Sequence, residues 1–140
     1  MTDKTVFNKT KIFIIDMDGT FYLDCRLIEG SVEFIDRLKE SGRDFCFFTN
    51  NSSHNAGACV KKLATMGFTV PKEKIVISSH VTIDYLQRHQ PGKSVFLLGN
   101  ALLEDDFRQA GIPLVNENPD IVVLGFDTTL TYQKMWDAVK

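Results

Sequence analysis

The sequence lacks the features that mark several large classes of protein. Its apolar runs, such as residues 121–124, are far shorter than the ~20 residues needed to cross a bilayer. No basic excess is present to neutralise a nucleic-acid backbone, because 16 Lys and Arg stand against 18 Asp and Glu. The dinucleotide motif GxGxxG and the P-loop motif GxxxxGKS/T do not occur. We therefore expect no membrane span and no nucleic-acid partner.

Cysteine is also scarce. Cys25, Cys46 and Cys59 are an odd number of separated residues without CxxC spacing, which favours reduced thiols over disulfides or a zinc site. Residues 1–11 are polar and mixed in charge, unlike the apolar h-region of a secretory signal peptide. These features predict a cytoplasmic protein.

What is present is an alternation of apolar, β-rich runs and helical patterns. The first half predicts strand 11–15, helix 31–40, strand 44–48, a helix around 60–66 and strand 74–77. The second half predicts helix 82–90, strand 95–98, helix 102–110, strands 112–115 and 121–124, and helix 131–140. The continuous apolar run at 11–15 is typical of a strand covered on both faces. We expect an α/β fold with a Rossmann-like parallel sheet in residues 1–77 and a second α/β unit in 78–140.

The pentapeptide Asp16-Met17-Asp18-Gly19-Thr20 directly follows the first predicted strand. A D-x-D-G-T motif arises by chance on the order of once in a thousand chains of this length. Open α/β sheets bind ligands where their parallel strands end. Two carboxylates two residues apart repel each other unless a cation lies between them, and Mg²⁺ prefers such oxygen ligands. Gly19 permits a tight turn whose amides can hold an anion, although an ordinary Asp-Gly turn is the simpler alternative.

A second polar loop, Thr49-Asn50-Asn51-Ser52-Ser53, follows the second long strand and precedes a helix. Its hydroxyl groups, amides and helix-start N–H groups suit a phosphate, and the alternative is an ordinary helix N-cap. Because neighbouring parallel strands end at the same edge of a sheet, we expect both loops to contribute to one site.

Together these motifs resemble the haloacid dehalogenase (HAD) superfamily, and more narrowly its NagD / 4-nitrophenylphosphatase-like branch with an α/β cap. The resemblance covers essentially the whole chain and rests on residues 16–24, 27–30 and 48–53, with a softer match to the cap at 118–127 and 130–134. It implies the first part of the catalytic core in residues 1–77 and a partial cap in 78–140. It also implies a phosphatase that acts on a small phosphorylated metabolite and uses Mg²⁺.

The resemblance assigns roles to particular residues. Asp16 would attack phosphorus and form an aspartyl-phosphate, while Asp18 would protonate the leaving oxygen and then activate water. Asp16 and Asp18 would also hold Mg²⁺, the latter through its backbone carbonyl. The residues that would bind phosphoryl oxygens are Gly19, Thr20, Thr49 and Asn50. Tyr22 and Asp24 would lie in a flap over the site and are secondary candidates.

The sequence departs from the family in one respect. The family also uses a lysine and an acidic Gly-Asp segment that follow the cap, and neither is found here. The expectation is therefore the N-terminal part of a longer phosphatase that binds Mg²⁺ weakly and turns over poorly alone. A homodimer is among the expected assemblies, and the substrate stays open.

Two other functions remain open on the sequence alone. A receiver-like phospho-acceptor domain also uses strand-end carboxylates and Mg²⁺, but its acceptor Asp follows a later strand. A non-catalytic remnant that binds a phosphorylated ligand or a partner chain is the other alternative. Among the remaining polar residues, His54 is a minor candidate for the site, and Lys61 and Lys62 are expected on a solvated helix face.

Overall fold

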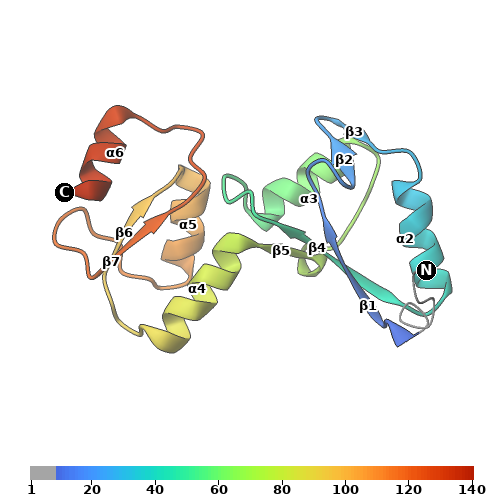
Figure 1. Ribbon diagram of the computed structural model, residues 1–140, viewed down its shortest axis with the longest axis horizontal. Helices are drawn as coiled ribbons and strands as arrows, with labels where there is room; N and C mark the ends of the chain where they lie inside the picture. Colours follow the sequence, from blue (N-terminus) through green and yellow to red (C-terminus); the bar gives the residue numbers. More distant parts are fainter. Residues whose placement is uncertain (1–8) are drawn as a thin grey trace, which may run out of the picture. The chain divides into compact units, whose positions relative to one another are not determined.

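The computed structural model describes residues 9–140 (Figure 1). The described chain divides into two compact units, and each is considered by itself. Unit 1 comprises the residues up to 49 together with residues 59–76, and unit 2 comprises residues 50–58 and 77–140. The division into domains at residues 1–77 and 78–140 stays a prediction.

Unit 1 is built on a three-stranded sheet in the order β1-β4-β5. The strands are β1 (Ile12–Asp16), β4 (Asp44–Thr49) and β5 (Ile75–Ile77), and β5 follows a short 3-10 helix, η1 (Lys72–Lys74). Helices α2 (Ser31–Glu40) and α3 (Ala56–Thr65) lie between them in the chain. Strands β1 and β4 pair in parallel, which confirms the predicted α/β fold with a parallel sheet. A small antiparallel hairpin of β2 (Tyr22–Leu23) and β3 (Arg26–Leu27) follows the first motif.

Aromatic side chains fill the core of unit 1 on one face of the sheet. The rings of Phe21 and Phe47 lie 4.6 Å apart, and Phe68 packs 4.9 Å from Phe21. The other face of β1 is open, because Ile12 and Ile14 are 53% and 71% exposed. The prediction that this strand is covered on both faces is therefore wrong for the described residues, which leave these two side chains largely exposed.

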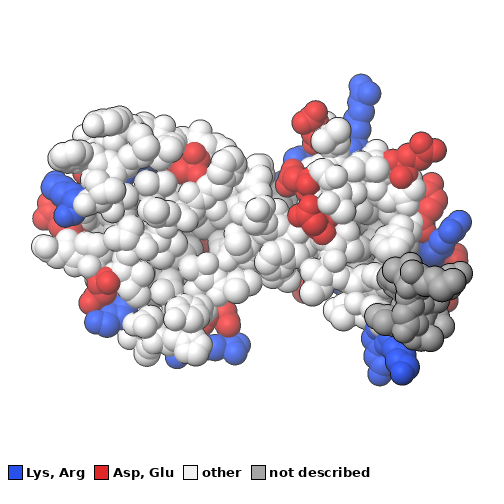
Figure 2. All heavy atoms as spheres, viewed as in Figure 1, with Lys and Arg blue, Asp and Glu red and all other residues white. Residues whose placement is uncertain are grey.

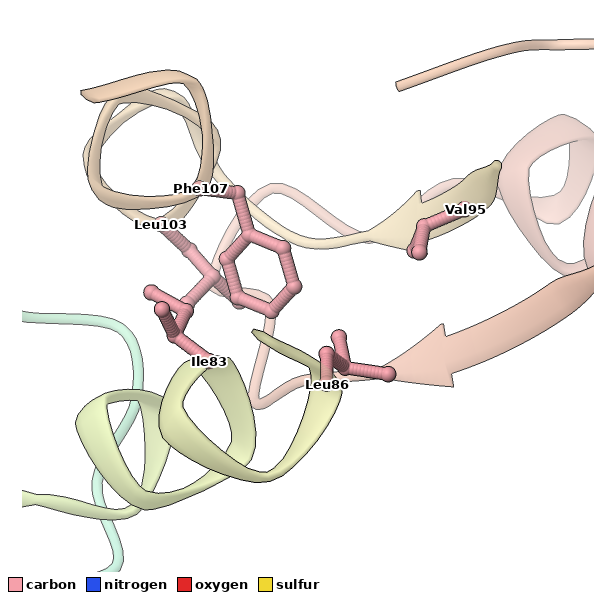
Figure 3. Close-up of a cluster of buried hydrophobic side chains, with 5 residues drawn as sticks. All are labelled: Ile83, Leu86, Val95, Leu103 and Phe107. Atoms are coloured by element: carbon pink, nitrogen blue, oxygen red, sulfur yellow. The ribbon is translucent and has the colours of Figure 1, made fainter. Parts of the chain in front are cut away.

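Unit 2 contains a two-stranded parallel sheet of β6 (Val95–Leu98) and β7 (Ile121–Leu124). Its helices are α4 (Ser78–His89), α5 (Ala101–Gln109) and α6 (Tyr132–Val139). Five buried side chains form its core, and Figure 3 shows them converging from α4, α5 and β6: Ile83, Leu86, Val95, Leu103 and Phe107. The i, i+3 and i, i+4 spacings on the two helices direct these side chains to the same side.

The predicted strand at residues 112–115 is wrong. The structure has only an isolated bridge between Leu114 and Val95 at this place. Pro113 lies in the middle of the segment and has no N–H to donate to a ladder. The carbonyl of Pro113 and the N–H of Val115 both bond to Val95, and the pairing extends no further.

Charged side chains are mixed over the visible surface. Figure 2 shows Lys and Arg in small groups beside Asp and Glu, without a broad basic patch on that face. Absence of a nucleic-acid partner stays a prediction. None of the helices within residues 9–140 has the length and apolar character that a bilayer crossing requires.

A partly buried ion pair ties α6 to the end of the sheet in unit 2. The side chain of Asp127 is fully buried, and its Oδ2 accepts a 2.6 Å hydrogen bond from Lys134 Nζ. Lys134 also donates to the carbonyl of Gly99 and to the hydroxyl of Thr129. Burial opposes ionisation of Asp127, but the bonds from Lys134 and Thr129 hold its pKa below the usual value. This stabilisation is present above the unfolded pKa of about 3.9 and is lost as the pH falls.

We expect Lys134→Met to lower the free energy of unfolding by about 1–2 kcal/mol, because it removes the charged partner of Asp127 and leaves only the hydrogen bonds from Thr129. Urea unfolding followed by circular dichroism measures the change. The double variant Lys134→Met/Asp127→Asn should recover part of the loss, since the unpaired charge is gone. Lys93→Met is the matched control, because the Lys93–Asp120 pair is 51% and 39% exposed. Equal losses in both lysine variants would contradict a special role for the Lys134–Asp127 pair.

Candidate active site

The loop after β1 carries the paired carboxylates. Asp16 is the last residue of β1 and pairs in register with Phe48, so Thr49 lies at the adjoining end of β4. Asp16 and Asp18 are both exposed. The loop winds around the fully buried Met17, whose carbonyl accepts hydrogen bonds from the amides of the three residues 20–22. The buried methionine thus anchors the loop and leaves both carboxylates at its surface.

The proposed phosphate-binding residues of this loop are partly engaged with the loop itself. The amide of Gly19 donates to the carbonyl of Tyr22 at 2.8 Å, and the amide of Thr20 donates to Met17. The Thr20 hydroxyl donates to Asp16 Oδ2 at 2.9 Å. Gly19 has φ +81°, a conformation that favours glycine, so the tight turn inferred for this residue is observed. That Gly19 and Thr20 bind phosphate stays a prediction.

Three side chains of unit 1 interact with Asp18. Lys62 Nζ lies 3.5 Å from Asp18 Oδ1 and 4.2 Å from the centre of the Tyr22 ring. Burial, together with its hydrogen bond to Asp18, raises the pKa of the Tyr22 hydroxyl well above its usual range. Burial, and then the charge of Asp18, raises the pKa of the Cys59 thiol to about 11. Tyr22 and Cys59 therefore remain neutral near neutral pH, and Lys62 is the cation beside Asp18.

Lys62 was not recognised from the sequence. The prediction places Lys61 and Lys62 on a solvated helix face, but the side chain of Lys62 is only 30% exposed and faces Asp18. No local pattern carries this signal, because α3 and the loop after β1 are far apart in the chain. The flap residue Asp24, also a candidate, is exposed at the β2–β3 turn with φ +53°.

The second loop begins in unit 1 and continues in unit 2. Thr49 is 2% exposed at the end of β4. From Asn50 onward the loop bonds to other parts of unit 2: Ser78 Oγ donates to the carbonyl of Asn50 at 3.2 Å, and the Phe126 amide donates to Ser52 Oγ at 2.7 Å. The ring of the minor candidate His54 lies within hydrogen-bond distance of the hydroxyl of Ser53, its neighbour in the chain. Phosphate binding by Thr49 and Asn50 stays a prediction.

The oxygen atoms that Asp16 and Asp18 offer are of the kind that Mg²⁺ prefers as ligands. Within residues 9–140, no three His, Cys, Asp or Glu residues lie together in a group that could hold a metal ion. Asp16 offers an exposed carboxylate, and Mg²⁺ commonly takes one or two carboxylates and completes its shell with water and substrate phosphate. The carboxylate of Asp18 faces Lys62, which leaves its backbone carbonyl as the oxygen it would give to a metal. Asp16 and Asp18 therefore fit a metal site that is incomplete without further ligands.

Comparison with known proteins identifies the family. The family model for haloacid dehalogenase-like hydrolases matches residues 13–113. The chain belongs to this family. A solved structure of 4-nitrophenylphosphatase from Thermotoga maritima is 47% identical with a TM-score of 0.89, covering 95% of this chain and 51% of that one. NagD from Escherichia coli is 29% identical with a TM-score of 0.82, covering 92% of this chain and 51% of that one. These neighbours place the chain in the NagD-like branch of the family, which confirms the resemblance.

Other relatives are also named for phosphatase activity. Acid sugar phosphatase from Staphylococcus aureus is 36% identical over 126 residues, which are 89% of this chain and 49% of the relative. A glycerol phosphate phosphatase from Mycobacterium tuberculosis, solved in complex with magnesium, is 26% identical with a TM-score of 0.81, covering 94% of this chain and 40% of that one. The chain itself spans about half the length of the curated relatives that it matches.

For the phosphatase activity that is proposed for this chain, we expect Lys62→Met to lower kcat about two- to fivefold with little change in KM, because Asp18 loses a partly exposed charge partner. Lys61→Met is the matched control, since Lys61 is exposed on the same helix. Steady-state kinetics of both variants measure the effect. Equal kcat values in the two variants would show that Lys62 does not act through Asp18.

Proposed function

We propose that this family member carries the nucleophile and the general acid of an Mg²⁺-dependent phosphomonoesterase. The observation that carries the proposal is the position of Asp16 and Asp18 at the carboxyl end of β1, beside the end of its parallel partner β4. This edge is where open α/β sheets bind ligands. The loop holds both carboxylates exposed while its backbone is anchored on a buried methionine.

In the proposed reaction the two carboxylates have separate roles. An oxygen of Asp16 attacks phosphorus and the bond to the leaving oxygen breaks, which gives an aspartyl-phosphate. Asp18 donates a proton to that leaving oxygen and then takes a proton from water. The water oxygen attacks phosphorus, the bond to Asp16 breaks, and inorganic phosphate is released. Bound Mg²⁺ would offset the negative charges of phosphate and carboxylate.

The other proposed site residues bind the phosphoryl group or position the two carboxylates. The Thr20 hydroxyl orients Asp16 through its 2.9 Å bond. Lys62 and Tyr22 hold the carboxylate of Asp18. Gly19, Thr20, Thr49 and Asn50 bind phosphoryl oxygens in the proposal.

The names of the relatives support a small phosphorylated metabolite as substrate. The curated relatives are named acid sugar phosphatases, and one solved neighbour is a glycerol phosphate phosphatase. Because this chain spans about half of such relatives, we propose that its own turnover is slow and rises when the remaining half is supplied. We also propose that the protein is cytoplasmic and forms a homodimer.

Hydrolysis of 4-nitrophenyl phosphate tests the proposal. The chain would be assayed alone and as a fusion to the half of the Thermotoga maritima enzyme that it does not cover, with and without Mg²⁺. We expect Mg²⁺-dependent release that is faster in the fusion and lost in both proteins when Asp16 is replaced by Asn. Release that survives this replacement, or no release from the folded fusion, would contradict the proposed function.

A further inference from the structure

Helix α6 has its polar side toward the rest of unit 2. The ammonium group of Lys134 bonds to the carboxylate of Asp127 and to the carbonyl of Gly99, which fixes this side of the helix. Asp137 and Ala138 lie on the same side, because successive residues of an α-helix are about 100° apart, and both are partly buried. The side that points to solvent is therefore the opposite one.

The solvent side of α6 is apolar. Four large residues form one stripe on it, at spacings of i, i+3, i+4 and i+7: Tyr132, Met135, Trp136 and Val139. They are 77%, 44%, 55% and 82% exposed, respectively. An amphipathic helix of a globular protein normally buries such a stripe. Within residues 9–140 this stripe stays largely uncovered, which indicates a surface for association.

Strand β7 adds apolar surface on the same side of the sheet. Val122 and Leu124 alternate with Ile121 and Val123, which pack against the unit 2 core, so they point to the other face. Helix α6 lies on that face, opposite α5 (Figure 1). Val122 and Leu124 are 45% and 68% exposed.

The exposed apolar area is large enough for a protein interface. Full side chains of this kind expose about 150–250 Å² each, so the α6 stripe and the two β7 residues together expose roughly 700 Å². The largest apolar patch of a typical monomer is about 300–600 Å². A stable interface buries about 800 Å² on each partner. The area is therefore close to what a specific dimer needs.

The α6 stripe is symmetric about its midpoint, which indicates a second copy of the chain as the partner. A two-fold axis between residues 135 and 136 sets a second α6 antiparallel to the first. Tyr132 then lies against the partner subunit's Val139, and Met135 lies against the partner subunit's Trp136. The lysines at position 140 lie at opposite ends of this pair, whereas a parallel pair would bring the two charges together.

We propose that two copies of this chain associate through an antiparallel, two-fold symmetric pair of α6 helices, with Val122 and Leu124 of β7 widening the contact. This inference rests on the homodimer of the proposed function and adds where the copies meet and in which orientation. The surface lies within unit 2 and includes no residue of the proposed active site. Because its area is slightly below the standard size, we expect a dissociation constant on the order of 10 µM.

Sedimentation equilibrium of the chain, at concentrations below and above the expected dissociation constant, measures the association. Trp136 is the only tryptophan of the chain, so its emission spectrum reports on the same surface and should shift to the blue as the dimer forms. Tyr132→Lys should raise the dissociation constant about tenfold or more, because two-fold symmetry places the new charge in the interface twice. Its melting temperature at low concentration should match that of the parent chain, since Tyr132 is exposed. Val81→Lys is the matched control, because Val81 is an exposed apolar residue of α4 in the same unit.

A pair of charges tests the orientation. Val139→Glu should weaken the dimer as Tyr132→Lys does. The double variant Tyr132→Lys/Val139→Glu should recover much of the affinity, because antiparallel packing sets the introduced lysine of one copy against the introduced glutamate of the other. Within one helix the two positions are seven residues apart and do not pair. A parallel pair would bring like charges together and give no recovery.

The outcomes separate this surface from the proposed function. A Tyr132→Lys variant that dimerises as tightly as the parent would overturn the surface and leave the homodimer standing. A chain that stays monomeric at every concentration would overturn both, and the phosphatase proposal would still depend on hydrolysis of 4-nitrophenyl phosphate alone. A monomeric fusion with blue-shifted Trp136 emission would show that the other half of the enzyme covers the stripe, which would also overturn the inference.

Discussion

Replacement of Asp16 by Asn is expected to reduce Mg²⁺-dependent hydrolysis of 4-nitrophenyl phosphate by on the order of 10³-fold or more, because the attacking oxygen becomes a poor nucleophile. The amide has nearly the shape of the carboxylate and can still accept from the Thr20 hydroxyl, which lies 2.9 Å from Asp16 Oδ2. The exposed position of Asp16 makes a large loss of stability unexpected. The loss should therefore appear in kcat rather than in folding.

The matched control for this variant is Asp24→Asn, since Asp24 is an exposed carboxylate in the adjacent flap. It should retain most of the activity, because in the proposal Asp24 does not touch the reacting atoms. The two variants should have similar melting temperatures. Equal losses of activity in both would point to a general effect of negative charge near the flap and against a nucleophilic role for Asp16.

Replacement of Asp18 by Asn is expected to slow hydrolysis about 10²- to 10⁴-fold for substrates that need protonation of their leaving group. Alkyl phosphates belong to this class, because an alkoxide is a poor leaving group. The 4-nitrophenolate ion leaves without much help, so the same variant should lose less activity toward 4-nitrophenyl phosphate. Comparison of kcat/KM for the two substrates measures this difference, because kcat/KM reports on the step that releases the leaving group, whereas kcat also includes hydrolysis of the shared aspartyl-phosphate.

The dependence of the rate on the leaving group distinguishes a general acid from a residue that only supports the loop. Asp18 also contacts Lys62 and Tyr22, so a variant that merely disturbed the loop would slow both substrates alike. Asp18→Glu provides a second control, because it keeps a carboxyl group at a shifted position. An equal loss of kcat/KM for alkyl and aryl phosphates in Asp18→Asn would contradict the assignment of Asp18 as general acid.

Features that depend on short stretches of chain could be predicted from the sequence. The helix at residues 31–40 and the strands at 95–98 and 121–124 are observed with the predicted bounds. The parallel pairing of β1 and β4 followed from the alternation of strands and helices. The D-x-D-G-T motif and the polar loop at residues 49–53 together indicated the family, because each motif is contiguous in the chain and follows an apolar strand.

Features that depend on contacts between distant segments could not be predicted. Lys62 approaches Asp18 only because α3 packs beside the loop after β1. The outward orientation of the apolar side of α6 is evident only once Lys134 meets Asp127 and the carbonyl of Gly99. The open face of β1 was also missed, since an apolar run predicts coverage but does not say which segment supplies it.

Chemical trapping of the phosphoryl group tests the central claim most directly. The fusion protein would be mixed with 4-nitrophenyl phosphate and Mg²⁺, quenched within one turnover and treated with borohydride, which reduces an aspartyl-phosphate to homoserine. We expect homoserine at position 16 by peptide mass spectrometry and none in the Asp16→Asn variant. Release of 4-nitrophenolate without modification of Asp16, or with the label on another residue, would contradict it.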